Sequence, residues 1–192
     1  GLNWKYIVGG MLAVGIVSPF LWSRMEGYQQ ERVIALFHQE DPAYAKILYQ
    51  QICGKISIGA GQITGRGLFS GEHHYVPLAY NDFFFSYLSE CLGFIGSIGV
   101  LLLLGAVCTR TLHTALRAQD ELGSYICIGI FGVLLAQTVI NIGMNLSLLP
   151  VIGVTLPFFS GGGTSMVMLF LCVGLVLSVY RVHPRELFDR QD

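Results

Sequence analysis

The sequence predicts an all-α integral membrane protein, a single membrane domain over residues 1–192 with about four transmembrane helices and one long structured loop outside the membrane. First, 53% of the 192 residues are hydrophobic and only 12% are charged, whereas soluble domains carry about 25% charged residues. Second, apolar stretches close to the ~20 residues that cross a bilayer recur along the chain. Third, arginines collect in alternate connections between these stretches. The mean hydropathy of +0.61 agrees with a chain whose main solvent is lipid.

Four apolar stretches qualify as membrane spans. They cover residues 6–22, 83–108, 125–149 and 164–180. The second stretch is interrupted by a single charged residue, Glu90. We therefore expect four helices that cross the membrane in alternating directions.

The basic residues of the connections predict the orientation. Residues 109–123 and the tail 181–192 contain arginines, whereas residues 150–163 contain no charged residue. Because short basic connections stay in the cytoplasm, both termini and residues 109–123 are expected there. Residues 23–82 and 150–163 are then extracytoplasmic, and residues 150–163 are expected to form an outer re-entrant loop.

The outer loop 23–82 is too long to serve only as a connector. Tyr28–Phe37 has the pattern of a short amphipathic helix that lies in the headgroup region. Residues 47–58 are apolar but too short to span, so we expect a re-entrant or partly buried helix there, carrying Lys55. The glycine-rich residues 59–71 are expected to form irregular coil.

Asp82 lies where this loop meets the second span. One interpretation is a helix N-cap, because an aspartate at that position accepts bonds from backbone N–H groups. The other is a general base whose pKa is raised by partial desolvation. Position alone leaves both open.

Polar residues inside the spans are the next candidates. Glu90 marks either a functional site or a buried pairing, because an ionisable group at that depth is costly. Gln137, Asn141 and Asn145 stand at i, i+4 and i+8 and form one stripe that faces protein. This stripe would make hydrogen bonds between helices or contact a ligand.

The connection 150–163 is rich in proline and glycine. Backbone N–H groups around Ser160–Ser165 could bind an anion such as a pyrophosphate at the start of the last helix. The alternative is a bare re-entrant turn, which membrane depth tolerates where protein covers it.

Three other patterns predict no site. The glycines of residues 59–67 have the wrong spacing for a nucleotide loop. The adjacent His73 and His74 are expected to point apart in a solvated loop, without a metal. The five cysteines form no CxxC pair and are expected to be small helix residues.

Four motifs occur in order along nearly the whole chain. They are Tyr28-Gln29-x-x-Arg32 with Phe37; Tyr49-Gln50-Gln51 with Lys55-Ile56-Ser57-Ile58-Gly59-Ala60-Gly61; Val76-Pro77-Leu78-Ala79-Tyr80-Asn81-Asp82-Phe83; and Asn141-Ile142-Gly143-Met144 through Ser160-x-Gly162-Gly163-x-Ser165. In content and order they resemble the SEDS family of bacterial cell-wall polymerases, the group of RodA, FtsW and SpoVE. Lys55, the Arg32 segment and Asn141 favour the RodA branch.

This resemblance implies a ten-span fold of which the chain supplies the C-terminal part. It also implies that lipid II is polymerised into glycan strands during elongation or division, with Asp82 as the base that deprotonates the attacking sugar hydroxyl. The expected setting is the bacterial inner membrane with its lipids, a class B penicillin-binding protein as transpeptidase partner, Mg or Mn as cation, and no nucleic acid. The expected substrate-binding residues are Arg32, Gln50, Lys55, Arg66, Glu90, Asn141, Ser160, Gly162 and Gly163.

The chain departs from the family pattern around Asp82. Leu78 and His74 replace glutamates, Tyr80-Asn81 replaces His-Thr, and Gly161 replaces a tyrosine. Asp82 is left without an acidic neighbour, so a cation site would have fewer ligands. Two other functions fit the sequence: a lipid II flippase with Glu90 and the polar stripe along its path, and a non-catalytic membrane partner of a transpeptidase.

Overall fold

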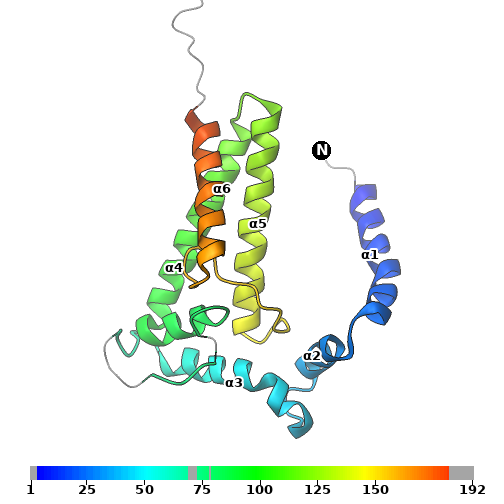
Figure 1. The fold of residues 1–192 in the computed structure, drawn as a ribbon, viewed down its shortest axis with the longest axis vertical. Helices are drawn as coiled ribbons and strands as arrows, with labels where there is room; N and C mark the ends of the chain where they lie inside the picture. Colours follow the sequence, from blue (N-terminus) through cyan, green and yellow to red (C-terminus); the bar gives the residue numbers. More distant parts are fainter. Residues whose placement is uncertain (1–3, 69–72, 78, 182–192) are drawn as a thin grey trace, which may run out of the picture. The chain divides into compact units, whose positions relative to one another are not determined.

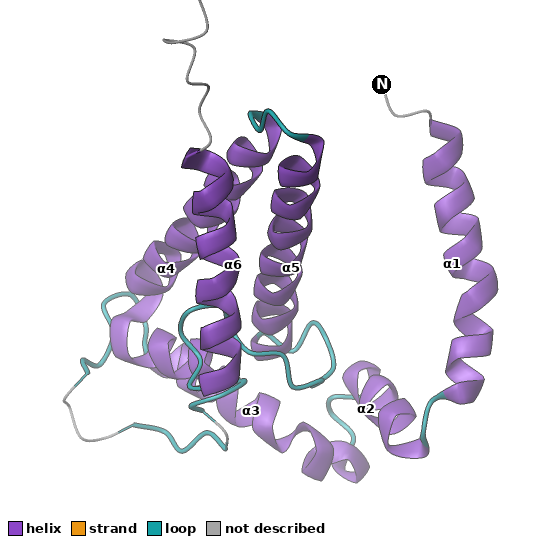
Figure 2. Ribbon diagram, turned by 45° about the horizontal axis from the view of Figure 1, so that its top comes forward, coloured by secondary structure: helices purple, strands orange, loops and turns teal. Residues whose placement is uncertain are grey.

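The computed structural model describes residues 4–68, 73–77 and 79–181, with the main chain alone for residues 5–7 and 10–14. The described residues form helices and loops without a strand (Figure 2). In chain order the helices are α1 (Trp4–Arg24), α2 (Gly27–Phe37), the short 3-10 helix η1 (Pro42–Tyr44), α3 (Ala45–Ala60), α4 (Phe84–Leu116), α5 (Glu121–Asn145) and α6 (Gly163–Arg181) (Figure 1). The all-α prediction is confirmed.

Three of the helices in the described part, α4, α5 and α6, are long and apolar enough to cross a membrane. They contain the predicted spans 83–108, 125–149 and 164–180, apart from a few residues at their ends. The predicted span 6–22 lies within the continuous helix α1, and its crossing of the membrane stays a prediction. Most of the predicted tail, residues 182–192, lies outside the described residues, as does Leu78.

α4 extends eight residues beyond the predicted span, because residues 109–116 contain neither proline nor glycine. The cytoplasmic connection predicted at 109–123 is correspondingly short in the structure, and α5 begins again at Glu121. The last two turns of α4 thus carry polar and basic side chains past the apolar segment.

The chain divides into two compact units, residues 1–48 and 49–192. In the first unit, α2 confirms the amphipathic helix predicted at Tyr28–Phe37. It begins with a capping box, in which the Glu26 and Gln29 side chains each bind the other residue's backbone N–H.

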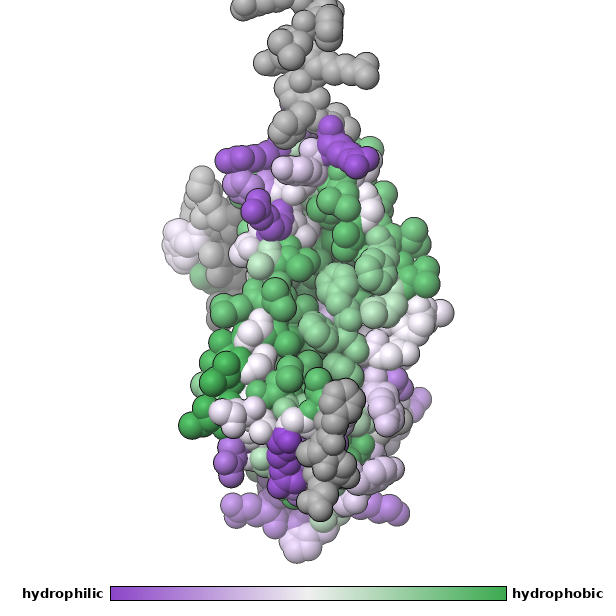
Figure 3. Space-filling model, turned by 90° about the vertical axis from the view of Figure 1, so that its left-hand side faces the viewer, coloured by the Kyte–Doolittle hydropathy of each residue, from purple (hydrophilic) through white to green (hydrophobic). Residues whose placement is uncertain are grey.

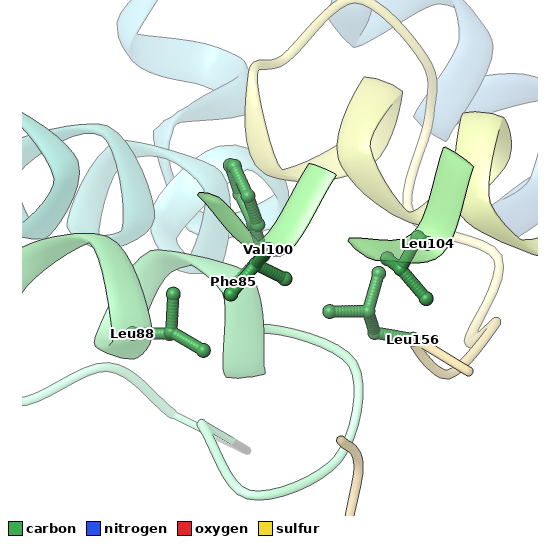
Figure 4. Packing of buried hydrophobic residues seen from close by; sticks show 5 residues of the cluster. All are labelled: Phe85, Leu88, Val100, Leu104 and Leu156. Atoms are coloured by element: carbon green, nitrogen blue, oxygen red, sulfur yellow. The ribbon is translucent and has the colours of Figure 1, made fainter. Parts of the chain in front are cut away.

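The second unit is built on α4, α5 and α6, which lie side by side (Figures 1 and 2). One apolar cluster joins α4 to the connection between α5 and α6; its buried members are Phe85, Leu88, Val100, Leu104 and Leu156 (Figure 4). Leu156 belongs to the 150–163 connection, so this connection packs against α4. That it is an outer re-entrant loop stays a prediction. A second cluster takes one buried residue from each helix: Cys108, Leu134 and Leu169.

α4 is broken at Gly93, whose backbone angles (φ 70°, ψ −169°) belong to a region open only to glycine. In a straight helix the carbonyls of residues 90 and 91 would accept from the amides of residues 94 and 95. At the break, the carbonyls of Glu90 and Cys91 accept from the Arg66 and Gly67 amides, both at 2.9 Å.

The two released amides are bound by the same loop. The Phe94 N–H donates to the Gln62 carbonyl at 2.9 Å, and the Ile95 N–H donates to the Ile63 carbonyl at 3.2 Å. Four hydrogen bonds to the loop therefore replace two helical ones. We call residues 61–67 together with residues 89–95 the glycine junction.

The glycine junction needs glycines because two main chains touch there. A Cβ on Gly61 would overlap the Ser89 carbonyl, one on Gly65 would overlap the Cys91 carbonyl, and one on Gly93 would overlap the Gly65 amide. α3 ends at Ala60, so the segment predicted as irregular coil begins there. Over residues 61–67 its conformation is held by the main-chain hydrogen bonds to α4.

We predict that Gly93→Ala lowers the free energy of unfolding by about 2–5 kcal/mol, from the forbidden backbone angles and the overlap with the loop. Gly99→Ala is the matched control. Gly99 lies in the same helix with open space around its Cα, and alanine is favoured over glycine in a helix by about 0.5–1 kcal/mol. The measurement is thermal unfolding of the full-length protein in detergent. Equal effects of the two substitutions would contradict the junction.

Candidate functional site

Asp82 immediately precedes Phe83, the N-cap residue of α4, which has no side-chain capping bond. The Asp82 carboxylate is half-buried and makes no hydrogen bond to the described residues. The cap interpretation is therefore wrong. Burial raises the pKa of the Asp82 carboxyl above its ordinary value, because the charged form has lost part of its hydration. The result is a carboxylate more basic than an exposed aspartate.

The 150–163 connection passes beside this carboxylate. A Cβ built on Gly153, which has a φ of 76°, would lie 3.7 Å from the Asp82 Oδ2 atom. Gly153 therefore lies close to the carboxylate, and its positive φ is a backbone conformation that favours glycine.

The main chain of Asp82 is held by α5. The Asn141 side-chain amide donates to the Asp82 carbonyl at 2.8 Å, and the Asn145 amide donates to the same oxygen at 3.1 Å. Asn141 also donates to the Val154 carbonyl at 2.7 Å. Both asparagines are fully buried, so these two members of the predicted stripe face protein. They bind loop carbonyls, and Asn145 also binds α4.

The two residues before Asp82 are held by the other loop. The Ser160 hydroxyl donates to the Asn81 carbonyl at 2.6 Å and accepts from the Leu156 amide at 2.8 Å. The Gly161 amide donates to the Tyr80 carbonyl at 2.8 Å. Three consecutive carbonyls are thus bound, and the Gly161 N–H is engaged by protein instead of being available to an anion.

The side chains of Asn145 and Gln51 connect these loops to α4 and α3. The Asn145 Oδ1 atom accepts from the Ser86 amide and hydroxyl in the first turn of α4, at 3.1 and 2.6 Å. The Gln51 amide on α3 donates to the carbonyls of Met144 in the last turn of α5 and of Leu149 beyond it, at 3.2 and 2.8 Å. The position of Asp82 is therefore set by α3, α4, α5 and the 150–163 connection together.

Glu90, which belongs to the glycine junction, is the centre of a separate polar cluster. Its carboxylate is fully buried; the Ser57 hydroxyl donates to Oε2 at 2.5 Å, and the His74 amide donates to Oε1 at 3.0 Å. Arg66 approaches Oε1 at 3.7 Å. Of the two interpretations of Glu90, the structure supports buried pairing.

The histidines are a correction to the sequence analysis. His73 and His74 were expected to point apart in a solvated loop, yet their Nδ1 atoms lie 3.9 and 3.0 Å from the same Glu90 oxygen. The cause is tertiary: the fully buried Glu90 carboxylate draws donors from the loop. No group of three or more His, Cys, Asp or Glu side chains suited to a metal ion occurs among residues 4–68, 73–77 and 79–181.

The other predicted residues are more scattered. Lys55 is exposed on α3, and the side chain of Gln50 is half-buried beside Gln51. Gly162 accepts from the Ser165 hydroxyl at 2.7 Å, and Gly163 is the first residue of α6. Arg32 belongs to the first unit, where its guanidinium lies over the Tyr28 ring at 5.8 Å.

Sequence analysis missed Gln51, Ser57 and Ser86. A signal was present for two of them, because Gln51, Gly54 and Ser57 recur every third residue and share one face of α3. Gly54 on that face lies against Ser86, since an added Cβ would be 2.9 Å from the Ser86 hydroxyl oxygen. Small and polar residues at helical spacing therefore indicated that this face of α3 packs closely against another helix.

Two curated relatives are similar over most of the chain. Peptidoglycan glycosyltransferase MrdB of Escherichia coli (strain K12) is 36% identical over 185 residues, which cover 94% of this chain and 50% of MrdB. Stage V sporulation protein E of Bacillus subtilis (strain 168) is 35% identical over 176 residues, which cover 91% of this chain and 46% of that protein. The chain spans about half the length of the curated relatives it matches.

Two solved structures share the fold. One, described as structural coordination of polymerization and crosslinking by a peptidoglycan synthase complex, superposes with a TM-score of 0.71 at 29% identity, covering 94% of this chain and 50% of that one. The other is an aspartate-to-alanine mutant of the Thermus thermophilus rod shape determining protein RodA, with a TM-score of 0.53 at 29% identity and coverage of 94% and 58%.

The family comparison covers nearly the whole chain. Residues 1–184 match the family described as cell cycle protein, which groups FtsW, RodA and SpoVE. The all-helical fold with apolar helices agrees with this match. The chain therefore belongs to the FtsW, RodA and SpoVE family.

Proposed function

We propose that the protein containing this chain is a peptidoglycan glycosyltransferase that polymerises lipid II, with Asp82 as general base. The observation that carries the proposal is a half-buried carboxylate of raised pKa, without a hydrogen-bond partner in the described part, on a main chain fixed at three successive carbonyls. The curated relative MrdB is named for this activity.

The proposed reaction needs one proton acceptor. A hydroxyl oxygen of the acceptor sugar forms a bond to the anomeric carbon of the donor while the bond from that carbon to the diphosphate oxygen breaks. The hydroxyl proton passes to the Asp82 carboxylate, and the diphosphate leaves on its lipid. A base with a pKa nearer to the working pH takes this proton more readily than an ordinary aspartate.

Cations stabilise the charge on the leaving diphosphate. Arg32, Lys55 and Arg66 are the proposed groups, together with residues outside this chain. Arg66 also approaches the Glu90 carboxylate. A divalent Mg or Mn ion is a further candidate, but the described residues group no three suitable ligands, and no step above passes through a metal.

The geometry favours the enzyme over a flippase. A flippase path along Glu90 and the polar stripe would need these side chains to face an open passage. Glu90, Asn141 and Asn145 are instead fully buried and hydrogen-bonded to protein groups. We further propose a bacterial inner membrane location with both termini in the cytoplasm, and a class B penicillin-binding protein as partner. The solved synthase complex, which couples polymerization to crosslinking, supports such a partner.

We predict that Asp82→Asn lowers lipid II polymerisation by about 10²–10⁴-fold, the usual contribution of a general base. The assay is formation of glycan strands from labelled lipid II by the full-length protein in detergent. Asp120→Asn, the same chemical change at the exposed start of α5, is the control and keeps wild-type activity. Polymer formation by Asp82→Asn at the wild-type rate would refute the base assignment.

The pH dependence follows from the raised pKa of Asp82. The base must be ionised to act, so the rate falls as pH drops through that pKa. Because burial raises it, the loss occurs above the value of about 3.9 of an exposed aspartate. The measurement is the polymerisation rate against pH at saturating lipid II. A rate that stays constant down to that value would contradict the proposal.

We predict that Asn141→Ala lowers the free energy of unfolding by about 1–3 kcal/mol, since two buried carbonyls lose a donor. It also lowers turnover, because the Asp82 carbonyl loses one of the two donors that hold it. Thr138→Ala, one turn earlier on α5, removes only a bond to the Leu134 carbonyl of its own helix and is the matched control. Wild-type turnover in Asn141→Ala would show that the bond to Asp82 does not position the base.

A further inference from the structure

The last turns of α4 carry a set of basic side chains far from Asp82 in sequence. Arg110, His113 and Arg117 stand at i, i+3 and i+7, a spacing that places them on one helix face. Together with Thr114, Val179 and Tyr180 they line a cavity of about 110 Å³ between α4 and α6.

The cavity carries positive charge that the described residues do not balance. Within the described ranges, none of the three basic residues of the cavity has a carboxylate at ion-pair distance. Like charges that line one cavity repel one another, and a bound anion offsets that repulsion. A planar guanidinium also matches the oxygens of a phosphate.

The cavity lies where the apolar parts of α4 and α6 end, which is where a membrane-spanning helix meets the lipid headgroups. Arg110 follows the buried Cys108 of the three-helix apolar cluster by two residues, and Arg181 ends α6. Figure 3 shows an apolar surface along these helices, with hydrophilic side chains gathered at the end where α4 and α6 finish. Basic pockets between transmembrane helices at this depth bind acidic lipid headgroups.

The surface next to the cavity favours a ligand with acyl chains. On α6, Leu177 and Leu175 precede Tyr180 and are 54% and 51% exposed. A lipid anchored at the cavity would extend its chains over these residues, whereas a free phosphate would leave them uncovered. We propose that the cavity formed by Arg110, His113, Arg117 and Tyr180 binds the phosphate of an anionic phospholipid.

The charges alone have a simpler role, since basic residues at helix ends orient a membrane protein. That role needs positive charge on one side of the membrane, but it needs neither a cavity nor one helix face. It also assigns the same weight to Arg181, which is outside the cavity. The comparison of these arginines therefore separates the two roles.

The test uses the full-length protein in nanodiscs that contain phosphatidylcholine and a minor fraction of phosphatidylglycerol. Native mass spectrometry measures the phosphatidylglycerol that remains bound to wild type, Arg110→Gln, Arg117→Gln, the double variant and Arg181→Gln. We expect each cavity substitution to weaken binding about fivefold, and the double variant about 25-fold if the effects add. Arg181→Gln should change binding by less than twofold.

Three outcomes would overturn the proposal. Arg181→Gln could weaken binding as much as the cavity substitutions, which would show general surface attraction only. The double variant could retain phosphatidylglycerol as wild type does. Inorganic phosphate could bind the protein as tightly as phosphatidylglycerol does, which would make the site one for a free anion. Thermal unfolding of each variant confirms that it is folded, and the result does not depend on polymerase activity.

Discussion

The break in α4 at Gly93 lies in an apolar helix, where each unpaired backbone N–H or C=O costs several kcal/mol. The structure meets that cost with four main-chain hydrogen bonds from residues 62–67. The surroundings of Glu90 depend on this arrangement. The loop that completes the broken helix also brings Arg66 to Glu90. Glu90 in turn binds Ser57 on α3 and His74 on the segment that leads to Asp82.

The Asp82 carboxylate differs from the polar groups around it in its hydrogen bonding. Asn141, Asn145, Ser160 and the Gly161 amide all direct their hydrogen bonds to main-chain carbonyls at residues 80–82. The carboxylate receives none from the described residues and is partly desolvated. A rigid backbone with an unsatisfied side chain suits a residue that must gain and lose a proton, because the energy of its charged form is not lowered by fixed donors.

The sequence was sufficient for the apolar helices and for the place of Asp82, since both depend on local composition. It could not identify which glycine breaks α4. Gly93, Gly96, Gly99 and Gly105 all lie in that helix, and the break occurs where a loop some thirty residues earlier supplies the missing partners. The same limit applies to His74, whose direction is set by a buried carboxylate sixteen residues away. That Asp82 does not cap α4 could likewise be learned only from the structure, in which Phe83 is the N-cap residue.

The glycine junction joins two segments through their main chains alone. The side chains of Gln62 and Arg66 can therefore vary without loss of the four bonds, whereas their spacing cannot vary. A deletion of one residue between 63 and 66 would change the separation of the two acceptors from the two donors, so both pairs could no longer be bound at once. Within this family, the length of that segment should consequently drift less than its composition, and insertions should occur outside it.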